Sequence, residues 1–184
     1  MKFNVFLAAL TGLTAAAACG SDTATTAGTA AGRVLVANDF ENLAGWGIDP
    51  ALLARDHAHS GVCAISVDPG HEFSLTYENA LGQLSAQKLR KVHLSAWVYL
   101  RGPAGGGGVL ALQITDPAQG YKAIGNDGIN LGEAVNEYNQ WVAVSKDVVL
   151  PETATSDSHL KVFLWRAGAT QAVFADDLRL TALD

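Results

Sequence analysis

Apolar and polar residues alternate along much of the chain after residue 32, and this pattern predicts β-strands. The clearest case is residues 92–100, where every second residue is apolar: Val92, Leu94, Ala96, Val98 and Leu100. Side chains of a strand point alternately to its two faces, so this segment has one apolar face to bury. We expect further strands at 33–37, 62–67, 73–77, 109–115, 121–124, 141–150, 160–165 and 173–180.

The segments between these strands carry turn signals. Asp68-Pro69-Gly70 is one of them, Pro151 ends another strand, and residues 126–137 have the composition of a loop. A turn of helix is expected near residues 50–54, where Pro50 suits a first helical position. Short strands separated by turns about every 8–12 residues indicate an all-β fold, and we predict a single β-sandwich of the jelly-roll type.

The first 32 residues have a different composition from the rest. Residues 1–18 combine Lys2 with an apolar run that ends in alanines, as in a secretory signal peptide. Ala16-Ala17-Ala18-Cys19 resembles a bacterial lipobox, in which Cys19 is lipidated. Residues 19–32 have no large apolar side chain and are predicted to form a flexible tether. We therefore expect a β-sandwich domain at 33–184, lipid-anchored to a membrane in the bacterial cell envelope, on its periplasmic or cell-surface side.

Charge and motifs exclude several classes of function. The formal net charge is −6, which argues against nucleic acid as a partner. The chain has no Gly-x-Ser-x-Gly and no His-Glu-x-x-His, and Asp176 and Asp177 cannot act as a glycosidase pair because neighbouring strand residues point to opposite faces. We therefore do not expect an enzyme. With Cys19 lipidated, Cys63 has no partner for a disulfide and is expected to pack as a small apolar residue.

The last strand carries a carboxylate among apolar residues. Strand periodicity places Asp176 on one face with Phe174, Leu178 and Leu180, and a carboxylate on a core face needs pairing or a metal. Asp39 and Glu41, near the first strand, are candidate partners. If the first and last strands meet, Asp39, Glu41 and Asp176 can share one hard cation through their oxygen atoms. The alternative is a solvated or hydrogen-bonded Asp176.

Aromatic residues form the candidate ligand site. Trp97 and Tyr99 lie opposite the apolar face of their strand, and Phe163 and Trp165 do the same in residues 160–165. If the two strands are neighbours in one sheet, the four rings form an exposed platform for sugar rings, with polar partners such as Gln113. The alternative is that these rings are covered by loops and belong to the core.

Several short motifs in order resemble a known family. They are Asp39-Phe40-Glu41 followed by Trp46, His59-Ser60-Gly61, Leu94-Ser95-Ala96-Trp97-Val98, Trp141 ahead of Leu150-Pro151, and Phe174-Ala175-Asp176-Asp177-Leu178. This order is similar to that of the galactose-binding-like jelly rolls, with the nearest likeness to carbohydrate-binding modules of the CenC type. The resemblance covers residues 33–184. It implies a β-sandwich that often holds a structural calcium, with Glu41, Asp176 and Asp39 as the matching ligands, together with backbone carbonyls near His59 and Ser60.

Two functions remain open from the sequence. The first is non-catalytic binding of a glycan or polysaccharide by a membrane-anchored lipoprotein with a structural calcium. The second is a structural or protein-interaction β-sandwich that binds no sugar. An exposed aromatic row beside amide side chains favours the first, and buried Trp97 and Trp165 favour the second.

Overall fold

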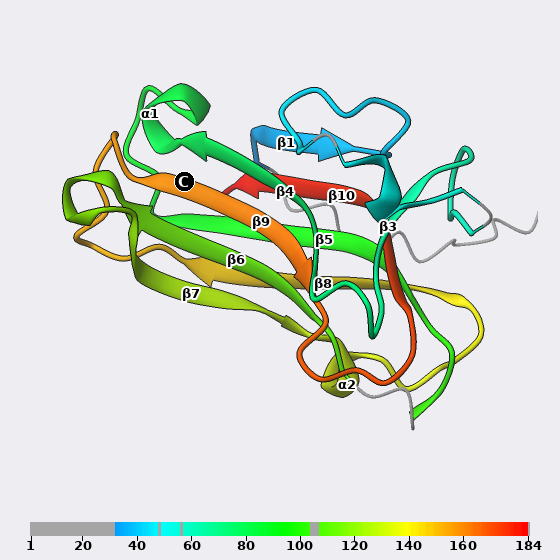
Figure 1. Cartoon of the computed structure of the whole chain (residues 1–184). Helices are drawn as coiled ribbons and strands as arrows, with labels where there is room; N and C mark the ends of the chain where they lie inside the picture. The colour runs from blue at the N-terminus through cyan, green and yellow to red at the C-terminus, as the bar shows by residue number, and fades with distance from the viewer. Residues whose placement is uncertain (1–31, 48, 56, 104–106, 184) are drawn as a thin grey trace, which may run out of the picture.

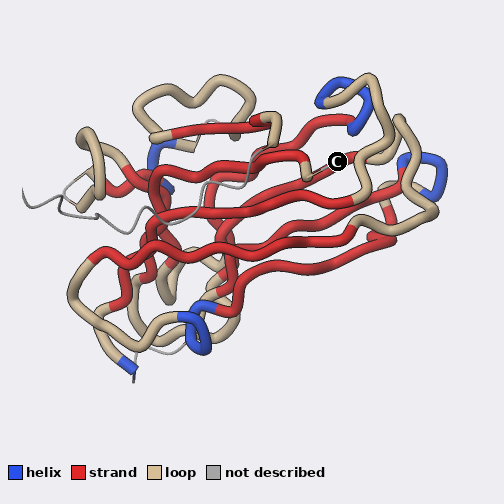
Figure 2. Tube along the Cα trace, turned by 180° about the vertical axis from the view of Figure 1, so that it is seen from behind, coloured by secondary structure: helices blue, strands red, loops and turns tan. Residues whose placement is uncertain are grey.

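The computed structural model describes residues 32–47, 49–55, 57–103 and 107–183. The predicted signal peptide, Cys19 and all but the last residue of the predicted tether lie outside the described residues. Among the residues described, no helix is long and apolar enough to cross a membrane. Strands make up most of the regular secondary structure of the described residues, and the helices there are single turns (Figure 2).

Two antiparallel sheets lie face to face (Figure 1). The first, sheet A, has the order β2-β3-β10-β5-β8, with β1 also paired to β10. Its strands are β1 (Val34–Asn38), β2 (Leu53–Ala54), β3 (Ala64–Val67), β5 (Lys91–Leu100), β8 (Trp141–Val149) and β10 (Val173–Ala182). The second, sheet B, has the order β4-β9-β6-β7. Its strands are β4 (Phe73–Ala80), β6 (Val109–Asp116), β7 (Lys122–Asn130) and β9 (His159–Trp165). The predicted all-β sandwich is confirmed.

Short helical turns connect some of these strands. They are η1 (Pro50–Leu52), α1 (Leu81–Leu84), η3 (Pro117–Gln119) and α2 (Leu131–Ala134). The turn η1 starts at Pro50, where the sequence predicts a turn of helix. In η3 the Asp116 carboxylate accepts a hydrogen bond from the Ala118 N–H, which caps a turn whose first residue is proline.

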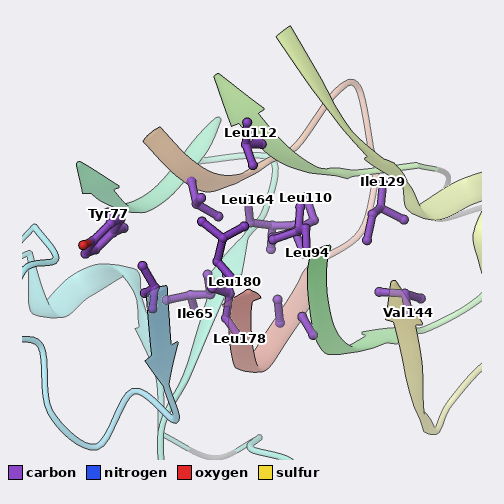
Figure 3. Close-up of a cluster of buried hydrophobic side chains, with 14 of the residues drawn as sticks. Ile65, Tyr77, Leu94, Leu110, Leu112, Ile129, Val144, Leu164, Leu178 and Leu180 are labelled. Carbon is purple, nitrogen blue, oxygen red and sulfur yellow. The ribbon is translucent and has the colours of Figure 1, made fainter. Parts of the chain in front are cut away.

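The hydrophobic core fills the space between the two sheets (Figure 3). Leu94 and Leu180 of sheet A and Leu110 and Leu164 of sheet B are all fully buried there. Strand β5 alternates between buried and half-buried residues along its whole length, as its sequence pattern predicts. Each fully buried leucine contributes roughly 1.5–3 kcal/mol of hydrophobic stabilisation.

Strand β7 is longer than the sequence predicts. The sequence favours a short strand at 121–124 and a loop from residue 126, yet β7 runs from Lys122 to Asn130. Gly125, Asn126 and Gly128 have low β propensity, but each lies opposite a residue of β6. Hydrogen bonding to β6 thus overrides the local preference.

A β-bulge in β10 changes the face on which Asp176 lies. Asp176 pairs with Trp97 of β5, but the next pair joins Arg179 to Ser95, so β10 has one extra residue. Asp177 has a φ of 47° at this bulge. Phe174 and Asp176 therefore lie on the outer face of sheet A, while Leu178 and Leu180 point into the core. The predicted common face for all four residues is wrong, because strand periodicity fails at a bulge.

Candidate functional site

The four predicted platform rings lie on opposite sides of the molecule. Trp97 and Tyr99 are on the outer face of sheet A, and Phe163 and Trp165 are on the outer face of sheet B. Strand β9 pairs with β4 and β6, and β5 pairs with β8 and β10. The predicted single platform is therefore wrong. Alternation shows which residues share a face of one strand, but it does not show which sheet that strand joins.

On sheet A a loop of residues 57–63, here called the covering loop, packs on the aromatic rings. The His59 ring stacks on Trp97 with centroids 4.0 Å apart and planes 12° apart. The His57 ring meets Tyr99 edge-on at 4.0 Å and stacks on Trp141 at 5.5 Å. Trp97 and Tyr99 are consequently half-buried by the protein's own side chains.

The buried Asp176 holds one end of the covering loop. Its Oδ2 accepts hydrogen bonds from the backbone N–H groups of His59 (2.7 Å) and Ser60 (3.0 Å), and its Oδ1 accepts one from the Asp177 N–H (2.7 Å). Burial raises the pKa of Asp176 above its ordinary value, and the backbone hydrogen bonds oppose that shift. The hydrogen-bonded alternative of the sequence analysis thus describes how Asp176 is satisfied here.

Glu41 holds the other end of the same loop. Its Oε1 accepts hydrogen bonds from the backbone N–H groups of Val62 (2.7 Å) and Cys63 (2.8 Å). Between the two anchored ends lies Gly61, whose φ is 59° and whose absent Cβ leaves room for the Glu41 carboxylate. Asp39 Oδ1 accepts a hydrogen bond from the Glu41 N–H (3.2 Å) and so supports the turn that carries Glu41.

These carboxylates bear on the predicted calcium site. In the described part of the chain, no three His, Cys, Asp or Glu side chains gather closely enough to hold a metal ion. Both oxygens of Asp176 and one oxygen of Glu41 accept backbone N–H groups instead. The arrangement does not fit a cation held by Asp39, Glu41 and Asp176 side chains alone, and calcium stays a prediction.

A histidine and a serine of the covering loop meet an aspartate of β10. His59 Nδ1 lies 2.6 Å from Asp177 Oδ2, and Ser60 Oγ donates to Asp177 Oδ1 (2.8 Å). Nucleophilic catalysis needs the serine hydroxyl to be hydrogen-bonded to the histidine that takes its proton. Here both side chains bind the same carboxylate, so the group does not activate Ser60.

On sheet B three rings form an exposed group, here called the aromatic patch: Phe73, Phe163 and Trp165. Phe73 and Trp165 are partners in the β4–β9 register, with 52% and 40% of their surface exposed. Their rings are 6.5 Å apart and within 19° of parallel. Phe163 meets Phe73 edge-on at 5.7 Å. The patch thus exposes two neighbouring, nearly parallel rings to solvent.

Phe73 is the ring that the sequence analysis does not single out. Simple alternation over residues 73–77 puts Phe73 on the same face as Leu75 and Tyr77, which are both buried. The β4–β9 register shifts between Phe73 and Thr76, and this irregularity turns Phe73 to the outer face. No local sequence signal marks that shift.

Small and amide side chains continue the face beside the aromatic patch. Next to Phe163 lies Ala111 on β6, and next to Ala111 lies Gly128 on β7. One pair along, Gln113 Nε2 donates to Asn126 Oδ1 (2.8 Å) across the same two strands. Ala111 and Gly128 carry a small side chain or none, so little projects from the sheet next to Phe163. The hydrogen-bonded amides of Gln113 and Asn126 follow further along the same two strands.

The charged groups on β4, β9 and the turn after β9 that border the aromatic patch are paired. Glu78 binds His159 Nδ1 (2.9 Å) and Lys161 Nζ (3.2 Å). Glu72 accepts a hydrogen bond from Trp165 Nε1 (2.8 Å) and binds Arg166. The bond from Trp165 and those from Arg166 hold the pKa of Glu72 below its ordinary value. The aromatic patch is thus bordered by charges that already neutralise one another.

Comparison with known proteins identifies the fold. No family model matches the chain, and no curated protein matches it either. Among solved structures, the chain is similar to the CBM22-1 xylan-binding domain of Paenibacillus barcinonensis Xyn10C. The two share 16% identity with a TM-score of 0.53, over 85% of this chain and 99% of that one.

Two further structures agree with the first. The C-terminal family 22 carbohydrate-binding module of Clostridium thermocellum Xyn10B shares 19% identity with a TM-score of 0.52, over 83% of this chain and 96% of that one. A family 16 carbohydrate-binding module shares 12% identity with a TM-score of 0.52, over 78% and 95% of the two chains. The fold implied by the resemblance is confirmed: the chain has the jelly-roll β-sandwich of carbohydrate-binding modules.

Proposed function

We propose that the chain is a non-catalytic module that binds a neutral polysaccharide on the outer face of sheet B. The observation that carries the proposal is the pair of exposed, nearly parallel rings of Phe73 and Trp165. Sugars present faces rich in C–H groups that pack on aromatic rings, while their hydroxyls need polar partners. Gln113 and Asn126 supply such partners beside the rings.

The charge pattern favours a neutral ligand. Recognition of an acidic sugar needs a cation that is free to bind its carboxylate. Lys161, His159 and Arg166 are each paired with a glutamate on this face. The solved neighbours described as xylan-binding have the same fold, and xylan is accordingly the first ligand to test.

Affinity electrophoresis tests this proposal. The β-sandwich, residues 33–184, is run through gels that contain single soluble polysaccharides, beginning with neutral xylan. We expect retardation, and we expect Trp165→Ala to abolish it. Val149→Ala is the matched control, because Val149 is 73% exposed on sheet A, away from the aromatic patch. If no gel in a broad neutral panel retards the protein, the proposal fails and the alternative of a sandwich that binds no sugar takes its place.

We further propose, from the sequence alone, that lipid on Cys19 attaches the module to a membrane of the cell envelope. The apolar run, the small residues before Cys19 and the following polar segment support this. Cys19→Ala should move the protein from the membrane fraction to the soluble fraction of the producing bacterium. An unchanged membrane fraction in that variant would contradict the anchor.

Calcium is likewise proposed, from the sequence resemblance, as a stabilising ion near Glu41 and Asp176 that would need ligands besides the Asp39, Glu41 and Asp176 side chains. A cation that binds only the folded state raises the free energy of unfolding by mass action. A chelator should then lower the melting temperature of the wild type, and Glu41→Ala should lower it and remove the response to chelator. A wild-type melting temperature that the chelator leaves unchanged would show that the backbone N–H groups alone satisfy these carboxylates.

A further inference from the structure

Glu72 connects the exposed indole ring of Trp165 to the turn that follows β9. Its Oε1 accepts a hydrogen bond from Trp165 Nε1–H (2.8 Å). Its Oε2 accepts one from Arg166 Nε (2.7 Å) and lies 2.6 Å from Arg166 Nη2. Guanidinium–carboxylate contacts with two nitrogens are short and specific in their geometry. Arg166 therefore fixes the Glu72 carboxylate through Oε2, and the same carboxylate holds the Trp165 indole through Oε1.

The position of Arg166 is fixed in turn by the backbone around it. Its N–H donates to the Glu72 carbonyl (2.8 Å), and its Nη1 donates to the Ala169 carbonyl (3.0 Å). The Ala169 N–H donates back to the Arg166 carbonyl (2.9 Å). Arg166 is thus a half-buried part of the turn.

A fixed ring matters for stacking on a sugar. A surface tryptophan without a bond to its N–H turns about two side-chain torsions. Ordering such a side chain when the ligand binds weakens binding by roughly two- to tenfold. With its N–H bonded to Glu72, the Trp165 ring lies within 19° of parallel to Phe73, so the two exposed rings have a fixed relative orientation before any ligand arrives.

We propose that Glu72 is a positioning residue of the glycan site. It holds the indole of Trp165 in the orientation on which the polysaccharide stacks, and it acts through Trp165 without touching the sugar. The inference rests on the proposed function, and it adds two residues, Glu72 and Arg166, that the sequence analysis does not select.

The first test follows the Trp165 indole N–H directly. The protein has four tryptophans, and Trp165→Phe identifies the signal of Trp165 in a nitrogen–proton correlation spectrum. Glu72→Ala should shift that signal and speed its exchange with solvent, and Glu72→Gln, which keeps a neutral oxygen acceptor, should give a smaller change. Asp147→Ala, which removes a similarly ion-paired carboxylate from sheet A, should leave it in place. An unchanged Trp165 signal in Glu72→Ala overturns the proposal.

The second test is a double-mutant cycle in the affinity gels. With Trp165 present, Glu72→Ala should weaken retardation by roughly two- to tenfold. In Trp165→Phe, which keeps a ring but has no N–H, the same change should weaken it no further. Equal losses in both backgrounds overturn the positioning role, because Glu72 then acts independently of the indole. If no polysaccharide retards the wild-type protein, the proposed function fails and the positioning role fails with it. If the wild type is retarded but the losses in the two backgrounds are equal, only the positioning role fails.

Discussion

At the scale of single residues, the most demanding group in the molecule is the Asp176 carboxylate. It is completely buried, yet it is satisfied by three backbone N–H groups, two of them from the covering loop. Buried donors that lose their acceptor cost about 1–3 kcal/mol each. The carboxylate therefore stabilises the fold by fixing the loop rather than by any contact with the core.

Asp176→Ala should reduce the free energy of unfolding by about 2–4 kcal/mol, because it leaves the His59 and Ser60 N–H groups without an acceptor. Asp176→Asn, which retains one oxygen, should cost less. Urea unfolding measures both, and Asp157→Ala at an exposed position should stay within about 0.5 kcal/mol of wild type. A small effect of Asp176→Ala would mean that the loop finds other partners.

At the scale of elements, the covering loop closes the outer face of sheet A. Asp176 and Glu41 each bind a pair of neighbouring N–H groups, and Gly61 links the two pairs. Its positive φ and the Glu41 carboxylate beside it both exclude a side chain at this position.

Gly61→Ala should therefore destabilise the protein by at least about 1–2 kcal/mol, because alanine is strained in the left-handed backbone conformation of this residue. Steric overlap between the new Cβ and the Glu41 carboxylate should add to this cost. Adding Glu41→Ala should remove the overlap but keep the backbone part, so the two changes should not be additive in thermal or urea unfolding. Gly102→Ala is the matched control, since Gly102 has open space where a Cβ would lie. Equal effects at Gly61 and Gly102 would contradict the role of the loop.

The sequence predicts elements better than it predicts their arrangement. Strands with strong alternation, such as 92–100 and 160–165, are found where the pattern places them. The pattern fails at Asp176 and Phe73, where an extra residue or a register shift turns side chains to the other face. It also does not show that β5 and β9 join different sheets, because that choice depends on contacts between residues far apart in the chain.

At the scale of the whole molecule, the net charge of −6 and the paired charges on sheet B together favour a neutral ligand. Retardation by neutral xylan should therefore change little between low and high salt, because screening affects only net electrostatic attraction. A carboxymethylated polysaccharide should retard the protein less than its neutral counterpart at low salt. Strong salt dependence, or preference for the anionic gel, would contradict the neutral-glycan site.

The proposed lipid anchor and the proposed glycan site belong to different sheets. Strand β1, the first strand of the described residues, belongs to sheet A (Figure 1), and the aromatic patch lies on the outer face of sheet B. A chain anchored by lipid at Cys19 would thus join the sandwich at β1 of sheet A, which is not the sheet that carries the aromatic patch. Tethered in this way, the module can rest near the bilayer and still present its rings toward a polymer in the surrounding space, so attachment and capture do not compete for the same surface.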